Sequence, residues 1–294
     1  MKINNGRTTG YKIFSMVTLV ILALLFLFPL YWIITGAFKT GAEIYATEVV
    51  WFPSEFTNNN FIRLFDRRSA PLFEFLGIMG PAVPGAIRWL VNTVFMAVMA
   101  MILTCITATM AGYALAKKRF IGRTLMFSLI VCAMALPKQV ILIPLLKEMS
   151  VLHLYDTLWA VILPTVGWPF GVFLMKQFSE GIPGEILEAA RVDGASEFNT
   201  FLTIVVPMVK PGIGALAIFT FINSWNDYFM QLVMLASNAN QTISLGIATM
   251  QAETSVDMGL LMAGTTLAAF PIIIVFLIFQ KYFTQGIAMG AVKG

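Results

Sequence analysis

Histidine and cysteine are scarce in this 294-residue sequence, which has one histidine, His153, and two cysteines, Cys105 and Cys132. A single histidine excludes a metal centre built from several imidazole ligands. Both cysteines lie inside apolar runs and are far apart along the chain. We therefore interpret them as small, buried, apolar side chains rather than as a disulfide or a redox pair, and we predict no metal site.

Charged residues are also few. They make up 12% of the sequence, against 59% for hydrophobic residues, whereas soluble domains usually carry about 25% charged residues. The net charge of +4 does not form a nucleic-acid footprint, because the basic residues stand at the ends of apolar segments. The composition predicts an integral membrane protein, partly covered by the lipid bilayer, with no nucleic-acid partner.

A nucleotide-binding motif is absent as well. The pattern G-x-x-x-x-G-K-[ST] occurs nowhere, and no other glycine-rich loop carries the lysine that holds phosphates. Phosphate binding requires preorganised backbone donors together with a cation. We therefore expect no cofactor in this chain and no enzymatic activity of its own, so any ATP chemistry must come from a partner.

Six apolar segments are present, each of a length that suits a membrane-spanning helix of about 20 residues. They lie near residues 13–38, 89–116, 125–146, 157–178, 209–235 and 259–283. Pro137 and Pro144 interrupt the third segment. The first is about twice as long as the apolar region of a signal peptide and has no small-residue cleavage site, so we expect it to be a true span. The predicted fold class is an all-α polytopic membrane protein, a single transmembrane domain over residues 1–294.

Basic residues set the predicted orientation, because lysine and arginine collect on the cytoplasmic side of a membrane. The N-terminal segment and the loop after the second span are basic, whereas the loop before the sixth span holds Glu253 and Asp257 and no base. Both termini are therefore predicted to be cytoplasmic. Residues 39–88 then form a long outer loop. Its end, residues 69–87, is moderately apolar and rich in glycine and proline, and we expect irregular structure or a short surface helix there.

A cytoplasmic loop at residues 181–207 separates the fourth and fifth predicted spans. Pro183 suits a helix start, and Glu188 near that start favours the positive end of the helix dipole. Ala189 and Ala190 are strong helix formers, and Gly194 then breaks the pattern. The loop is predicted to be a helix, a glycine bend and a second short helix outside the bilayer, with a small acidic face that could seat in a groove on another protein.

This loop resembles the "EAA" loop of permease subunits in ABC importers. The pattern E-A-A-x-x-D-G-A-x-x-x-x-x-F-x-x-I-x-x-P holds without a gap from Glu188 to Pro207. Residues 137–144, 163–170, 224–228 and 286–294 resemble the carbohydrate-uptake branch of that family, and in particular the six-span permease of the maltose transporter. The outer segment around residues 69–85 is longer and more apolar than the family pattern, which puts the contact with a binding protein in doubt.

The resemblance implies a type I ABC importer permease fold in a bacterial cytoplasmic membrane. It implies a heterodimer with a second, homologous permease, two cytoplasmic ATPase subunits that bind ATP and Mg, and an extracellular solute-binding protein. It assigns coupling to the ATPase to the residues of the loop that match the motif. These are Glu188, Ala189, Ala190, Asp193, Gly194, Ala195 and Pro207.

Polar residues inside the predicted spans are candidates for the translocation pathway, because a polar group in the bilayer is costly to desolvate. The set is Asn92, Lys138, Gln139, Trp225, Asn226, Asp227 and Tyr228. Aromatic faces and amides of this kind suit a sugar. Alternatively, Lys138 extends to the outer surface and Asp227 lies at the headgroup level. Asn92 can equally bridge neighbouring helices.

The sequence therefore predicts a permease subunit for a sugar or an oligosaccharide. One alternative is an ABC permease for a non-carbohydrate solute, such as a glycerol phosphodiester or a polyamine. A secondary transporter driven by an ion gradient would need titratable residues deep in the spans, and only Lys138 and Asp227 qualify loosely. A membrane-anchored receptor or scaffold would need a soluble domain, and we find none in the sequence.

Overall fold

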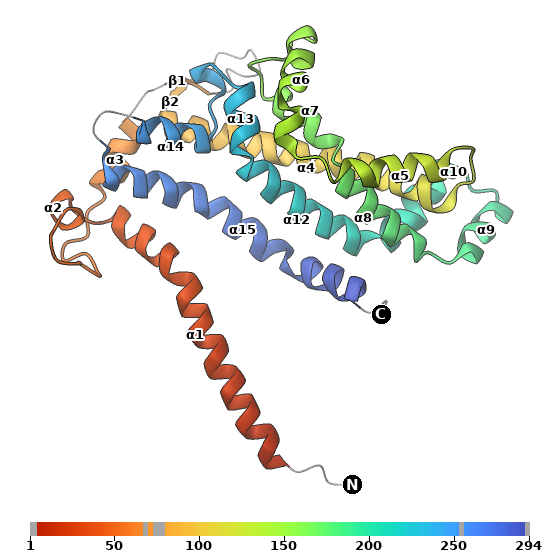
Figure 1. Cartoon of the computed structure of the whole chain (residues 1–294), viewed down its shortest axis with the longest axis horizontal. Helices are drawn as coiled ribbons and strands as arrows, with labels where there is room; N and C mark the ends of the chain where they lie inside the picture. The colour runs from red at the N-terminus through yellow and green to blue at the C-terminus, as the bar shows by residue number, and fades with distance from the viewer. Residues whose placement is uncertain (1–4, 67–69, 73–79, 253–255, 292–294) are drawn as a thin grey trace. The chain divides into compact units, whose positions relative to one another are not determined.

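The computed structural model describes residues 5–66, 70–72, 80–252 and 256–291. These residues are mostly helical, and four helical segments are long and apolar enough to cross a membrane, or up to six if each of two bent helix pairs forms one span. The prediction of a helical protein with several membrane spans is confirmed. Figure 1 labels the elements in chain order.

Four predicted spans coincide with long helical segments. They are α1 (Asn5–Ala37), α4 (Gly85–Lys117), the pair α7 (Trp159–Val166) and α8 (Pro169–Glu180), and α15 (Met258–Ala291). The side chains described between residues 10 and 28 of α1 are almost all exposed. A helix that is apolar on every side, as this one is, meets lipid rather than water.

The third and fifth predicted spans are bent. The third consists of α5 (Arg123–Ala133) and α6 (Lys138–Val151), which meet at an angle of 106° just before Pro137 and Lys138. The fifth contains α12 (Lys210–Asn226), which is interrupted at Asp227 and followed by α13 (Tyr228–Met234). At its start, α12 bends by 77° from the helical stretch Glu197–Met208, and these two segments are the second bent pair. Proline at position 137 accounts for the first break, because it cannot donate to the helix ladder.

The chain divides into two compact units, one made of residues 1–67 and 247–269 and the other of residues 68–246 and 270–294. In the first, α2 (Gly41–Ile44) and α3 (Asn59–Asp66) follow α1. The start of α15 packs closely on the end of α1, since a Cβ on Gly36 would lie 2.1 Å from the Met262 sulfur. Arg63 on α3 forms an ion pair with Asp257 at 2.5 Å.

The second unit is built around α4, against which α7, α8 and α12 pack. Gly112 of α4 makes this packing tight, because a Cβ there would lie 2.6 Å from the backbone at Met175 and Lys176 of α8. Two apolar clusters form the core, one around Met96, Ile162 and Met234 and the other around Met175, Val205 and Leu216. Small residues at a helix contact let membrane helices approach closely.

The remaining elements of this unit are short. They are β1 (Ala70–Pro71), β2 (Ala82–Val83), α9 (Gly184–Val192), α10 (Glu197–Thr200), the π-helix η2 (Phe201–Val205), α11 (Val206–Met208), the 3₁₀ helix η3 (Asn238–Asn240) and the start of α14 (Ile243–Gln251). The strands pair antiparallel, Ala70 with Val83 and Pro71 with Ala82. They lie in the segment 69–87 expected to be irregular or to form a short surface helix, of which residues 69 and 73–79 fall outside the described part.

Candidate functional site

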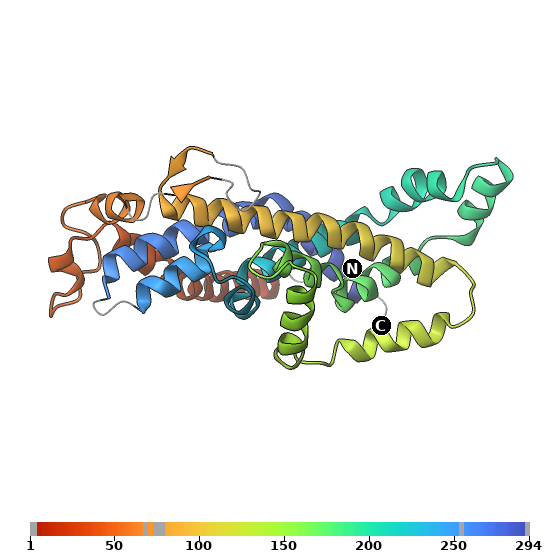
Figure 2. The ribbon, with the colours of Figure 1, turned by 90° about the horizontal axis from the view of Figure 1, so that it is seen from above.

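The predicted coupling loop, residues 181–207, lies at the end of the second unit where α4 and α8 finish. Figure 2 shows α9 beyond the last turn of α4. Lys117, the last residue of α4, donates hydrogen bonds from Nζ to the carbonyl oxygens of Glu180 at 3.0 Å and Ile182 at 2.6 Å. The start of the loop is therefore attached to α4 as well as to α8.

The first helix of the loop ends in a Schellman motif centred on Gly194. The amide of Gly194 donates to the carbonyl of Arg191 at 3.0 Å, and that of Ala195 donates to the carbonyl of Ala190 at 2.9 Å. Gly194 has φ +76°, in the left-handed region that favours glycine. Residues 189–195 therefore encode the end of a helix together with the glycine that terminates it. The predicted bend is present at Gly194.

A second helical stretch returns the chain to the bundle, as predicted. Ser196 caps α10 by accepting a hydrogen bond from the amide of Asn199 at 3.2 Å. A single π-helical turn, η2, follows, and Pro207 stands in the first turn of α11, where a missing N–H leaves no helical bond unmade. We refer to residues 181–207 as the elbow; its first arm is α9, and its second arm is the stretch from α10 through α11.

Charged and aromatic contacts fix the second arm to the end of α4. Lys118 pairs with Glu197, which also lies 3.4 Å from Arg191. The hydrogen bond from Lys118 is the main reason that the pKa of Glu197 lies below its ordinary value. The ring of Tyr113 on α4 also lies 5.7 Å from the ring of Phe201 at the start of η2.

The outer face of the elbow carries large apolar side chains. Val192 is 87% exposed and Phe198 67%, and Ile186 and Leu202 are also exposed. Among the predicted coupling residues, Glu188, Ala189, Asp193, Gly194 and Pro207 are exposed, Ala195 is half-buried and Ala190 is buried. Exposed apolar side chains beside a charged residue, on a segment that projects from the bundle, have the character of a protein-docking surface.

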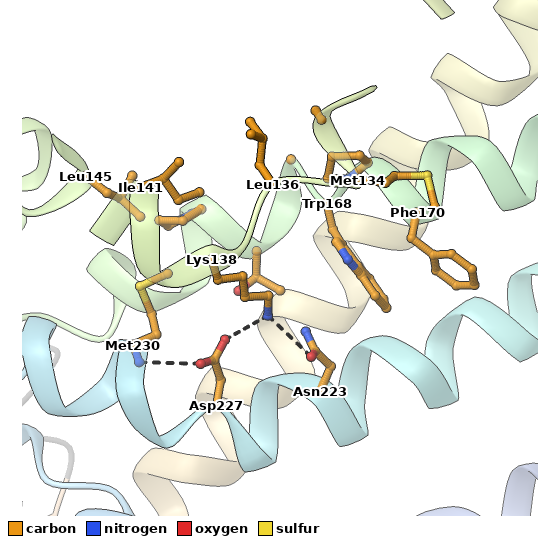
Figure 3. A pocket seen from close by; sticks show the side chains of 15 residues that line it. Met134, Leu136, Lys138, Ile141, Leu145, Trp168, Phe170, Asn223, Asp227 and Met230 are labelled. Carbon is orange, nitrogen blue, oxygen red and sulfur yellow. Dashed lines mark hydrogen bonds and ion pairs between the residues drawn. The ribbon is translucent and has the colours of Figure 1, made fainter. Parts of the chain in front are cut away.

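A second candidate site is a cavity of about 450 Å³ where three helix breaks meet. The breaks lie between α5 and α6, between α7 and α8, and between α12 and α13. Figure 3 shows Lys138 reaching from the start of α6 toward Asp227 and Asn223. Helix breaks of this kind free backbone groups at membrane depth only where they line a cavity or are buried in protein.

An ion pair crosses this cavity. Lys138 Nζ lies 2.9 Å from Asp227 Oδ2 and donates to Asn223 Oδ1 at 3.3 Å. The other carboxylate oxygen of Asp227 accepts from the amide of Met230 at 3.4 Å and so caps α13. Asp227 therefore stabilises the bend and compensates the charge of Lys138.

The other predicted pathway residues are spread around this bend. Asn226 lines a neighbouring cavity and donates to the Ile222 carbonyl at 2.9 Å. Gln139 is exposed, and Tyr228 is half-buried against the apolar core. Trp225 is 2% exposed and its ring lies 5.4 Å from that of Phe221, inside the packing of α12.

Asn92 lies apart from this group. It is fully buried and donates to the carbonyls of Ala239 and Gln241, both at 2.9 Å. These bonds attach α4 to the connection that follows α13, so Asn92 occupies the bridging position considered above for an amide.

Trp168 and Asn223 also line the cavity and were not among the pathway residues predicted from the sequence. Trp168 stands in the break between α7 and α8, with its ring 5.0 Å from that of Phe170. The residue before a proline is biased away from helical backbone, so Pro169 was the signal for this break. Asn223 lies one helical turn before Asp227, and that spacing on α12 could have placed it on the same face. Within the described residues, no three His, Cys, Asp or Glu side chains gather into a group that could hold a metal ion.

Comparisons with known proteins agree on one family. Residues 108–289 match the family described as "Binding-protein-dependent transport system inner membrane component", a range that includes the elbow and the cavity. The chain is 34% identical over 275 residues to the arabinooligosaccharides transport system permease protein AraQ of Halalkalibacterium halodurans, covering 93% of each chain. It is 30% identical over 271 residues to the lactose transport system permease protein LacG of Rhizobium radiobacter, covering 92% of each.

A solved structure shares the fold. It is a bacterial ABC transporter involved in the import of the acidic polysaccharide alginate, whose matched chain superposes with a TM-score of 0.79 at 23% sequence identity. The match covers 96% of this chain and all of the other.

Proposed function

Since this chain belongs to the family of inner membrane components of binding-protein-dependent transport systems, we propose that it is the permease subunit of an ATP-driven importer for a sugar or an oligosaccharide. Relatives named for arabinooligosaccharide and lactose transport support that substrate class. A transport subunit of this kind catalyses no reaction itself.

The proposed arrangement has six spans, with α5–α6 as the third, α7–α8 as the fourth and α12–α13 as the fifth. Both termini and the elbow lie in the cytoplasm of a bacterial cell, and residues 1–294 act as one permease domain. The basic residues of the N-terminal segment and of residues 117–123 support this orientation, because they collect on the cytoplasmic side.

The structure of the elbow is the observation that best supports this proposal. It combines an exposed Glu188 and Ala189 with a left-handed Gly194 and exposed apolar side chains, on a segment that projects from the bundle. We assign its outer face to a cleft of a cytoplasmic ATPase. Two ATPase subunits with bound ATP and Mg, a second permease and an extracellular binding protein complete the transporter.

The transport cycle then follows from a two-state equilibrium. ATP closes the ATPase pair, the elbow moves with its cleft, and the spans rotate to open the cavity to the outside, where the binding protein releases its sugar. Hydrolysis resets the inward-facing state. ATP can drive this change only through its different affinity for the two states.

The test of this function is the pair of variants Glu188→Lys and Gly194→Pro in a reconstituted transporter. Both should abolish uptake and leave membrane insertion unchanged, because they alter only the docking face and its bend. Gly184→Ala is the matched control, since an added Cβ there meets nothing within 4 Å and its φ is not left-handed. Wild-type uptake in both test variants, or uptake by the purified chain in liposomes without an ATPase, would contradict the proposal.

A further inference from the structure

Two neighbouring cavities in the second unit share the same four side chains. One has a volume of about 450 Å³ and the other about 430 Å³. The shared residues are Lys138, Trp168, Asn223 and Asp227. Both volumes fall within the range of about 300–1,000 Å³ that is usual for small-ligand sites.

The charges around these cavities cancel. Lys138 and Asp227 are the only charged side chains among the described residues that line either cavity, and their charged atoms lie 2.9 Å apart. An anionic ligand would need a cation without a counterion, and the Asp227 carboxylate would repel it. A cationic ligand meets the same obstacle with the signs reversed. The electrostatics therefore favour an uncharged ligand.

The uncharged side chains offer one aromatic surface and several hydrogen-bonding groups. Trp168 is half-buried and lines both cavities, so an aromatic surface faces the shared space (Figure 3). The amides of Asn223 and Asn226 supply both donors and acceptors. The Lys138 ammonium has three N–H donors, of which Asp227 and Asn223 accept two.

From this combination we infer that Lys138, Trp168, Asn223 and Asp227 form a subsite of this chain that selects uncharged saccharides. The indole packs on the C–H face of a sugar ring, and the amides and the ammonium bond its hydroxyls. Asp227 acts on selectivity by cancelling the charge of Lys138. This inference rests on the proposed import function and narrows its substrate class to neutral sugars.

The test is ligand-observed NMR on the purified, complete membrane complex without binding protein, so that the binding protein does not contribute and the variants below report on this cavity. The probes are arabinotriose, maltotriose and trigalacturonate. We expect the wild type to favour a neutral trisaccharide over the uronate by at least about tenfold, the factor that 1.4 kcal/mol represents. Asp227→Asn should shift the preference toward trigalacturonate, because it leaves Lys138 unbalanced while asparagine still caps α13.

Three further variants separate selectivity from folding. The double variant Lys138→Gln with Asp227→Asn should restore the preference for neutral sugar, because the cavity is again uncharged. Trp168→Ala should weaken binding of neutral sugar by up to about tenfold. Trp168→Phe should weaken it by less, because phenylalanine keeps an aromatic face. Lys147→Gln is the matched control, an exposed lysine on α6 outside both cavities.

Three results would overturn the inference: a wild type that binds trigalacturonate as tightly as the neutral sugars, one that binds neither neutral sugar, or an unchanged preference in Asp227→Asn. The import function itself is measured separately, as ATP hydrolysis stimulated by the binding protein. A complex that retains this stimulation and prefers the uronate would refute the subsite and leave the importer assignment intact.

Discussion

Replacement of Gly194 by alanine isolates the bend of the elbow from everything around it. A Cβ at this position would meet nothing within 4 Å, so the effect is one of backbone conformation alone. Holding alanine at the observed φ of +76° costs roughly 1–2 kcal/mol. Alanine also lowers the conformational entropy of the unfolded chain, which offsets about 0.4–1 kcal/mol of this cost. The net loss is about 1 kcal/mol, or roughly a fivefold shift toward an opened bend.

The matched change, Gly184→Ala, should have the opposite sign. Gly184 also has open space around it, but its φ lies outside the left-handed region. Alanine there restricts only the unfolded chain and stabilises by up to about 1 kcal/mol. A series of substitutions at Gly194 adds a second check. Asparagine tolerates the left-handed region better than alanine does. Proline fixes φ at about −65° and also removes the N–H that donates to the carbonyl of Arg191.

Hydrogen–deuterium exchange of residues 184–200 in the assembled transporter measures the bend, and uptake into proteoliposomes measures coupling. We expect amides 191–195 to exchange about fivefold faster in Gly194→Ala and no faster in Gly184→Ala. Uptake should fall in the order glycine, asparagine, alanine, proline at position 194. Equal exchange in the two alanine variants would refute the conformational reasoning, and normal uptake with an opened bend would refute the coupling role.

Three further predictions follow from contacts described above. Gly112→Ala should lower the melting temperature in detergent, at a cost of about 1–3 kcal/mol, because its Cβ would press on the backbone at Met175. The stabilisation that Glu197 gives to the elbow should be constant from neutral pH down to the ordinary glutamate pKa and should be lost as pH falls through the lowered pKa of Glu197, measured by exchange over a pH series. Hydrogen bonds from the backbone amides of Thr40 and Ser54, in that order of effect, lower the pKa of Glu43 to about 2. NMR titration should therefore show a Glu43 carboxylate that stays charged down to about that pH.

Each of these predictions has a control. Gly10→Ala should not lower the melting temperature, since nothing lies within 4 Å of the added atom and its φ is not left-handed. Glu197→Gln should remove the pH dependence of the elbow, so a dependence that survives in this variant points to another group. A Glu43 carboxyl that titrates near its ordinary value would show that the hydrogen bonds to Thr40 and Ser54 do not form.

The spans and the elbow were predictable because their signals are local. Long apolar runs specify membrane helices wherever they pack, and alanine, aspartate and glycine around Gly194 encode a helix and its stop signal. Pro137 likewise marked the break in the third span. These features depend on a few neighbouring residues and on backbone chemistry, and tertiary contacts need not be known.

The cavity was harder to predict because it depends on which helices meet. Asp227 ends α12 with neither proline nor glycine, and it acts through Lys138, 89 residues away in the chain. Trp225 lies two residues before Asp227, yet helical geometry turns it into the core, while Trp168 from another span reaches the cavity. Composition alone cannot distinguish two such tryptophans.

The two hydrogen bonds from Lys117 have a mechanical consequence. They join the last turn of α4 to the carbonyl groups where α8 gives way to the elbow. The start of the elbow is therefore attached both to α8, which it follows in the chain, and to the last turn of α4, which packs against α8. If the elbow moves during transport, a displacement at its start reaches the end of α4 directly through Lys117, and α4 extends from there over about 50 Å at 1.5 Å per residue.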